Sequence, residues 1–159
     1  MTVNLRPANR EDVPVIAELI RGLARYEKLE DQVEMTEELL AAGLFGKRPY
    51  AEVVLAEEDG AAMGFALFFH NFSTFMGRPG IYLEDLFVLP EQRGRGIGRM
   101  LLAHLARLAV DRGCGRLEWA VLDWNRDAIG FYEKLGARPL SDWTVYRLTG
   151  EALIGLARQ

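Results

Sequence analysis

The sequence predicts a mixed α/β fold, with a central twisted mixed β-sheet and helices on both of its faces. Three observations predict it: two helix-like stretches lie in the first third of the chain, a hydrophobic strand hairpin follows them, and a strand–helix–strand unit comes next. Such a crossover makes its two strands parallel, whereas a hairpin makes them antiparallel, so the sheet is expected to be mixed. The 159 residues, half of them hydrophobic, suffice for one continuous core, and a single domain over residues 1–159 is expected.

The first elements are a short strand and two helices. Residues 3–5 indicate the strand, and Asn9 can cap a helix whose apolar residues recur at helical spacing as far as Tyr26. Thr36 is a second capping residue, and the two glutamates after it favour the first turn of a helix. This second helix is expected to stop at Gly43.

Three strands follow the helices. Residues 51–57 and 61–71 are predicted strands, and Asp59-Gly60 between them is a hairpin signal because both residues tolerate positive φ. Residues 81–89 form a third strand, which Pro90 ends.

A crossover and a last helix complete the predicted order. Residues 97–110 carry an apolar stripe at helical spacing, and residues 116–122 alternate as a strand. Asn125 then caps a helix that Gly136 ends. Residues 138–149 are interpreted as two short final strands.

Composition excludes several classes of partner and site. A net charge of −4 provides no general attraction for a phosphate backbone, so no nucleic-acid partner is expected. Cys114 is the only cysteine, which rules out an internal disulfide and suits a reducing compartment. No apolar run approaches the ~20 residues of a membrane helix, so a cytoplasmic protein without a membrane partner is expected. His70 and His104 are isolated, and no metal is predicted.

A glycine-rich loop precedes the crossover helix. It runs from Arg93 to Gly98 and has glycines at alternate positions. Glycines let backbone N–H groups approach an anion closely, and the helix N-terminus adds unpaired donors and roughly +0.5 of a charge. Arg93 and Arg95 can add bidentate contacts. The loop is therefore a candidate phosphate site, and a flexible turn without a ligand is the alternative.

Two other phosphate motifs fit this loop less well. A Walker loop ends in Gly-Lys-Ser/Thr, whereas Gly98 is followed by Arg99 and Met100, so that motif is excluded. A dinucleotide fingerprint has the spacing G-x-G-x-x-G after the first strand, whereas these glycines are spaced G-x-G-x-G after a later strand. The dinucleotide interpretation is the weaker alternative.

The same loop resembles the R-x-x-G-x-G/A pyrophosphate loop of the GNAT superfamily of acetyltransferases. Residues 125–137 resemble the Asn, Ala, Phe-Tyr, Leu-Gly helix segment of that family, and two motifs in the right order are more specific than one. The likeness extends from residues 5–8 through 23–27 and 82–85 to the C-terminus, and it points to the diamine acetyltransferases, which act on spermidine, spermine or thialysine. It implies acetyl-CoA as co-substrate and a homodimer.

The resemblance also implies where acetyl-CoA binds. In the family, the strand before the loop splays from its neighbour and its main chain pairs with the pantetheine arm, while the loop holds the pyrophosphate. The last helix begins beside the cofactor, although Asn125 has a structural role as helix cap too. The matching residues are Leu86, Phe87, Val88, Arg93, Gly94, Arg95, Gly96, Ile97, Gly98, Arg99, Asn125, Arg126, Asp127, Ala128 and Tyr132.

Glu84 is the candidate base. A primary amine with a pKa near ~10.4 is protonated at neutral pH and must lose a proton before it attacks a thioester. Strand alternation places Glu84 opposite Asp85, and an inward-pointing Glu84 would be partly desolvated, with its pKa raised toward a useful value. The matching family residue is a general base acting through water. A solvent-facing carboxylate is the alternative.

Tyr132 is the candidate acid. Departure of coenzyme A requires stabilisation of a thiolate, which a phenol beside the sulfur can supply. Pattern alone favours a structural tyrosine with a satisfied hydroxyl. The resemblance of Phe131-Tyr132 to the family motif implies the catalytic role instead.

An acidic segment is the candidate acceptor site. Six acidic residues crowd residues 27–38 against Lys28 alone, a local field that attracts a cationic amine, although such runs are usually solvated surfaces. The resemblance implies these substrate-binding residues: Tyr26, Glu27, Glu84, Glu118, Trp119, Ala120 and Thr144. Residues 74–76 lack the acidic residue and tryptophan of the spermidine/spermine enzymes, so thialysine, another diamine or an unrelated small amine stay open.

Two further functions remain as alternatives. One keeps the fold but acetylates a protein N-terminus or lysine side chain. The other is a non-catalytic acyl-CoA-binding domain, which the presence of both Glu84 and Tyr132 disfavours.

Overall fold

The computed structural model describes residues 2–159, which divide into two compact units with the boundary after Ala120. The first unit contains a sheet with the strand order β1-β2-β3-β4-β5. Neighbouring strands are antiparallel except β4 and β5, which are parallel. The strands are β1 (Asn4–Pro7), β2 (Glu52–Glu58), β3 (Ala61–Ser73), β4 (Arg78–Val88) and β5 (Leu117–Trp119). The predicted mixed α/β fold is confirmed.

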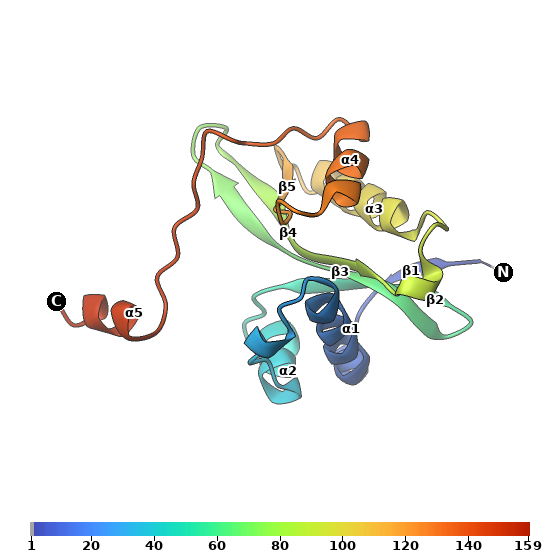
Figure 1. Ribbon diagram of the computed structural model, residues 1–159, viewed down its shortest axis with the longest axis horizontal. Coiled ribbons are helices and arrows are strands. Elements are labelled where there is room, and N and C mark those ends of the chain that lie inside the picture. Colours follow the sequence, from blue (N-terminus) through green and yellow to red (C-terminus); the bar gives the residue numbers. More distant parts are fainter. Residues whose placement is uncertain (1) are drawn as a thin grey trace. The chain divides into compact units, whose positions relative to one another are not determined.

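Helices cover both faces of this sheet (Figure 1). Helices α1 (Val13–Tyr26) and α2 (Glu37–Phe45) lie on one face, and α3 (Ile97–Asp111) lies on the other. Short 3-10 turns precede or follow them at Arg10–Asp12, Glu30–Gln32 and Pro90–Gln92.

The main core lies between the sheet and the first two helices. Burying these apolar side chains supplies the main driving force for folding. The core is formed by Val13, Ile16, Ala17, Leu19 and Leu23 of α1, Leu40 and Leu44 of α2, and Val53, Leu55, Phe65 and Phe87 of the sheet. A second set of buried residues in α3, including Leu101 and Leu105, covers the opposite face.

Side-chain caps begin the helices where the sequence indicates. Asn9 caps the turn that leads into α1, since its Oδ1 accepts a hydrogen bond from the Glu11 N–H at 2.9 Å. Thr36 Oγ1 accepts from the Leu39 N–H at 3.1 Å and starts α2. The predicted stop at Gly43 is wrong, because α2 continues to Phe45. Burial of Leu44 in the core offsets the roughly 1 kcal/mol cost of a glycine within a helix.

The hairpin prediction is confirmed, and β4 has a feature that no pattern indicated. Asp59 and Gly60 have φ of 52° and 78°, as a tight two-residue turn requires. On β4, Asp85 pairs with Leu67 and Leu83 pairs with Phe68, so Glu84 has no partner in β3. This β-bulge changes the face to which the following residues point.

The second unit contains helices α4 (Arg126–Lys134) and α5 (Gly150–Ala157). Asn125 caps α4 through a hydrogen bond from the Ala128 N–H at 3.3 Å, and Gly136 after it has φ of 93°. The two predicted final strands are wrong: residues 138–149 join no sheet in the described chain and are exposed. Alternation alone does not make a strand, because a strand needs a partner for its backbone groups. The strand predicted at 116–122 is also shorter, Leu117–Trp119.

Across residues 2–159, none of the helices combines the length and apolar character needed to cross a bilayer.

Candidate active site

Strands β4 and β5 separate after a short paired stretch. They pair only where Ile81–Leu83 faces Leu117–Trp119. From Glu84 to Val88, no strand of the described chain pairs with this edge of β4, while β3 pairs with the other edge. The backbone of residues 86–88 therefore offers an edge to which an extended ligand can add, as the predicted splay requires.

The glycine loop leads from the end of this edge into α3. Gly94 and Gly96 have φ of 80° and 79°, a conformation that favours glycine, and α3 begins at Ile97. The first N–H groups of a helix have no acceptor within it, so the loop presents donors to an anion. A Cβ at Gly94 or Gly96 would meet no atom within 4 Å, so the space over the loop is open. The residues present fit a pyrophosphate group.

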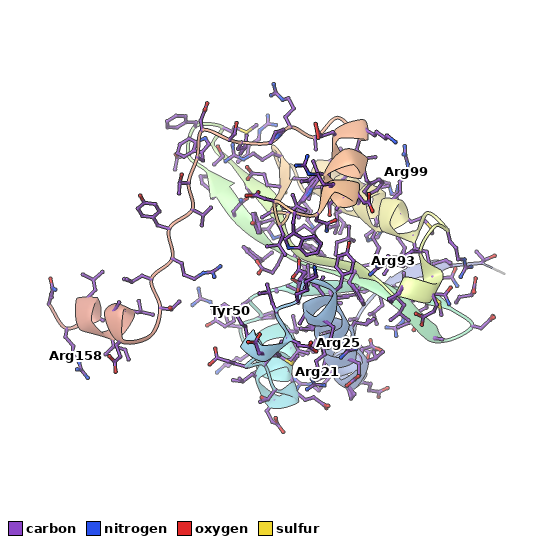
Figure 2. The ribbon with its side chains drawn as sticks, viewed as in Figure 1. Arg21, Arg25, Tyr50, Arg93, Arg99 and Arg158 are labelled. Atoms are coloured by element: carbon purple, nitrogen blue, oxygen red, sulfur yellow. The ribbon has the colours of Figure 1, made fainter. Side chains whose placement is uncertain are left out.

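The two loop arginines contact protein groups. Arg95 Nη2 lies 2.6 Å from Glu58 Oε2, and its Nη1 lies 2.6 Å from Gln92. Arg93, which is labelled in Figure 2, donates from its Nε to the Val88 carbonyl at 3.0 Å. Its guanidinium lies 4.5 Å from the centre of the Tyr26 ring. Both side chains are therefore engaged by the protein in this structure, whereas the space over the loop backbone is open.

Three carboxyl groups influence one another beside the bulge. Burial, with the nearby charges of Glu84 and Glu27, raises the pKa of Asp85 to about 7. Burial, followed by the charge of Glu84, also raises the pKa of Glu27, at the end of α1. Glu84 itself is exposed, which agrees with the alternative of a solvent-facing carboxylate, and the enclosed carboxyl group is its neighbour Asp85. The bulge changes the face to which the residues after Glu84 point, and this places Asp85 on the face that α1 covers.

Tyr82 and Glu118 extend the polar surface toward β5. The two residues are paired in the parallel register. Burial, together with the charges of Glu84 and Glu118, raises the pKa of Tyr82. Glu118 is held by Arg116, whose Nε lies 3.2 Å from its Oε1, and by Asn71, which donates at 3.2 Å. Its charge is therefore partly balanced by the protein.

The rest of the acidic segment is a solvated surface. Of its acidic residues only Glu27 is partly buried, whereas Glu30, Asp31, Glu34, Glu37 and Glu38 are exposed. Glu37 and Glu38 lie in the first turn of α2, where negative charge stabilises a helix.

An open apolar groove lies between α2 and β3. Its volume is about 390 Å³, and Leu67, the partner of Asp85 in β3, is part of its lining. The other lining residues are Glu34, Met35, Leu39, Leu40, Gly43, Leu44, Tyr50 and Ala51. The groove therefore lies on the face of the sheet that α1 and α2 cover, the face to which Leu67 points.

The remaining predicted site residues lie apart from this group or in the second unit. Trp119 pairs with Leu83, which is buried on the α3 face, and Ala120 follows β5. In the second unit, Tyr132 lies in α4 with its ring centre 5.6 Å from that of Phe131. Arg126, Asp127 and Ala128 form the first turn of α4, and Thr144 is exposed in the segment before α5.

Sequence reasoning missed Asp85, Tyr82 and Arg116. The available signal for Asp85 was a second carboxylate next to Glu84 in an apolar strand. Its burial depends on the bulge, which the sequence pattern did not reveal.

The open β4–β5 seam, followed by a glycine loop and a helix N-terminus, defines the GNAT class of fold. The sequence model of the acetyltransferase (GNAT) family matches residues 16–137. The chain belongs to this family and is an acetyltransferase.

Full-length relatives and solved structures agree with this assignment. The chain is 42% identical to a thialysine N-epsilon-acetyltransferase from Bos taurus, over 98% of this chain and 97% of the relative. It is 34% identical to an L-ornithine N5-acetyltransferase from Arabidopsis thaliana, over 96% and 87%. The structure of an integron cassette protein from the mobile metagenome of V. cholerae superposes with a TM-score of 0.84 at 30% identity, covering 100% and 99%.

Proposed function

We propose that this protein transfers the acetyl group of acetyl-CoA to a primary amine of a small diamine or diamino acid, with thialysine as the leading example. The full-length similarity to thialysine N-epsilon-acetyltransferases carries this proposal. The carboxyl groups of Glu27, Glu84 and Asp85 support it, because burial and neighbouring carboxylates raise the pKa values of Glu27 and Asp85, and such a cluster of acidic groups attracts a cationic amine. Ornithine is a second diamino acid, and the similarity to an ornithine acetyltransferase supports the same substrate class.

The co-substrate binds, in this proposal, along the seam and loop. Backbone groups of residues 86–88 pair with the pantetheine arm, and the N–H groups from Gly94 to Arg99 hold the pyrophosphate. Arg93 and Arg95 stay candidate contacts, which requires each to leave the protein partner it has here. Residues 125–128, at the start of α4, and Tyr132 complete the proposed cofactor site.

The chemistry needs a base for the ammonium and an acid for the leaving sulfur. Glu84, exposed at the bulge, is the proposed base through a water molecule. Tyr132 is the proposed acid. Acetyl-CoA supplies the activated acetyl group as a thioester.

The acceptor is held, in this proposal, by Tyr26, Glu27 and Glu118, with Trp119, Ala120 and Thr144 as further candidates. Glu27 binds the second, non-reacting ammonium, because a bound cation would offset the burial and the charge of Glu84 that raise the pKa of this carboxyl group. The apolar groove that Leu67 lines is a candidate for accepting the hydrocarbon part of the molecule.

One domain and a homodimer complete the proposal. The family match at residues 16–137 spans the boundary between the two units, which supports a single functional domain. Large apolar side chains such as Trp143, Val145 and Tyr146 are 78%, 90% and 91% exposed in the single chain, which supports association with a second copy. A cytoplasmic location is proposed as well.

Release of coenzyme A across a panel of amines tests the function. The panel holds thialysine, ornithine, spermidine, putrescine, matched monoamines and a peptide with a free N-terminus. Rapid thiol release with the diamines supports the proposal. Release with the peptide alone would favour a protein acetyltransferase, and release with none would favour a non-catalytic acyl-CoA-binding domain.

A further inference from the structure

The bulge places two consecutive carboxyl groups where β4 leaves β5. Glu84 has no partner in β3 and is exposed, whereas Asp85 pairs with Leu67 and is partly buried. Asp85 lies on the same face as Phe87, which packs in the core with α1. One carboxyl group of the pair therefore meets solvent, and the other is enclosed by protein.

The groups that face Asp85 are mostly negative or uncharged. Along β4 it meets Glu84, from the end of α1 it meets Glu27, and from β3 it meets the uncharged Leu67. Tyr82 lies on the same face of β4 as a neutral phenol, because its pKa is raised. Among cations, Arg93 lies 5.5 Å from the centre of the Phe87 ring, and Arg25 lies at the same end of α1.

We propose that Asp85 takes up the proton that leaves the acceptor ammonium, through the water that Glu84 holds. This inference rests on the proposed function and refines it: Glu84 still acts through the water, but the proton passes on to Asp85. Burial and the two neighbouring carboxylates raise the pKa of Asp85 to about 7, which suits a group that must gain and release a proton near neutral pH. The exposed Glu84 orients the water, and its charge strengthens Asp85 as a base.

Asp85 accepts the first proton in the reaction. The ammonium nitrogen loses one proton to the Asp85 carboxylate and then forms the C–N bond with the acetyl carbon. The C–S bond breaks with its electron pair on sulfur, which takes a proton from the Tyr132 phenol. The nitrogen loses its second proton, through water, to restore the phenol. Asp85 finally releases its proton to solvent, so ammonium and thioester become amide, thiol and one free proton.

The pH dependence of kcat/KM separates Asp85 from Glu84. The wild-type profile should rise with pH and level off above about 7. This rise below about pH 7 is the acid limb of the profile. Asp85→Asn should lose it and turn over roughly 10²-fold more slowly at pH 8. Its rate should keep rising above pH 8, because more of the amine is then neutral. Glu84→Gln should keep the limb but move it to lower pH, because a negative neighbour of Asp85 is gone. Asp111→Asn, at the exposed end of α3, is the matched control and should keep the wild-type profile.

A direct titration provides a readout apart from activity. The carboxyl carbon of Asp85, followed by NMR in the free protein, should titrate near pH 7, and Glu84→Gln and Glu27→Gln should each lower its midpoint. These two variants keep Asp85 and test the proposal even if Asp85→Asn does not fold.

The outcomes distinguish this inference from the proposed function. If Glu84→Gln abolishes the acid limb while Asp85→Asn retains it, Glu84 is the sole base and the role of Asp85 is refuted, although the enzyme remains an amine acetyltransferase. A midpoint for Asp85 near its ordinary value would refute it equally. If no amine in the panel releases coenzyme A, both the function and this inference are overturned.

Discussion

Adjacent carboxyl groups on β4 have different environments although one peptide bond separates them. Glu84 is in solvent, and Asp85 is enclosed. An enclosed carboxylate costs free energy whenever it is ionised, because protein solvates charge less well than water does. A cost of this kind is typical of a residue retained for function, and it has a measurable consequence for stability.

Asp85→Asn should stabilise the protein at high pH. In the unfolded chain this carboxyl ionises near its ordinary pKa of 3.8, and in the folded chain it ionises at about 7. Its neutral form therefore favours folding at low pH, and that stability is lost as pH rises through 7. The variant should exceed the wild type by up to about 4 kcal/mol of unfolding free energy at pH 8, and by little near pH 4. Urea unfolding at both pH values measures this.

Asp111→Asn is the control for this stability change. It removes an exposed carboxylate and should leave the pH dependence unchanged. Equal stability of Asp85→Asn and the wild type at every pH would show that Asp85 ionises without cost.

Tyr132→Phe tests the acid at the level of one hydroxyl group. Loss of the phenol proton should lower kcat by roughly 10²-fold while the affinity for acetyl-CoA is largely kept. Steady-state kinetics and calorimetry measure the two effects. Tyr146→Phe, at an exposed tyrosine of the same unit, should retain wild-type kcat. Wild-type turnover in Tyr132→Phe would assign Tyr132 to packing.

Among the elements, the loop before α3 has a conformation that glycine favours. Gly96 has φ of 79° and open space where a Cβ would lie. Gly96→Val should therefore weaken acetyl-CoA binding by about tenfold or more, since its side chain enters the space proposed for the pyrophosphate. Calorimetry with acetyl-CoA measures this, and NAD should bind far more weakly than acetyl-CoA to the wild type.

Gly60→Val is the matched control for backbone strain. Gly60 has nearly the same φ, 78°, and equally open space, but it lies in the β2–β3 hairpin. Both variants should lose similar stability, and only Gly96→Val should lose affinity. Equal affinities in the two variants would locate the cofactor elsewhere.

For the whole molecule, the preference for diamines is the decisive property. A second ammonium beside the Glu27 carboxylate adds on the order of 1 to 3 kcal/mol of binding, or about 5- to 150-fold in kcat/KM over a matched monoamine. The advantage should fall with added salt, because the site is open to solvent. Comparing thialysine, spermidine and putrescine with monoamines at two salt concentrations measures it.

Glu27→Gln should remove this preference, whereas Glu30→Gln should keep it. The two residues belong to the same acidic segment, but Glu27 is partly buried beside Glu84 and Glu30 is exposed. If Glu27→Gln retains the preference, or if monoamines perform equally well, the acidic surface does not select the acceptor.

The sequence by itself determined the features that depend on local spacing and on single residues. The caps at Asn9, Thr36 and Asn125 and the Asp59-Gly60 turn were predictable because each depends on neighbouring backbone groups. The helical stripes and the order of the main strands follow from periodicity. The family was recognisable because a phosphate loop and a helix motif occur in the right order.

The tertiary structure alone decided what depends on partners distant in sequence. The bulge at Glu84 arises from the register between β4 and β3, so alternation within β4 alone could not predict that Asp85 is buried. Residues 138–149 alternate as strands do, yet they lack a partner strand within the described chain. The contacts of Arg93 with Tyr26 and of Arg95 with Glu58 likewise join residues far apart in the chain. Burial, strand register and charge pairing depend on contacts between residues that are distant in sequence, and local sequence does not specify those contacts.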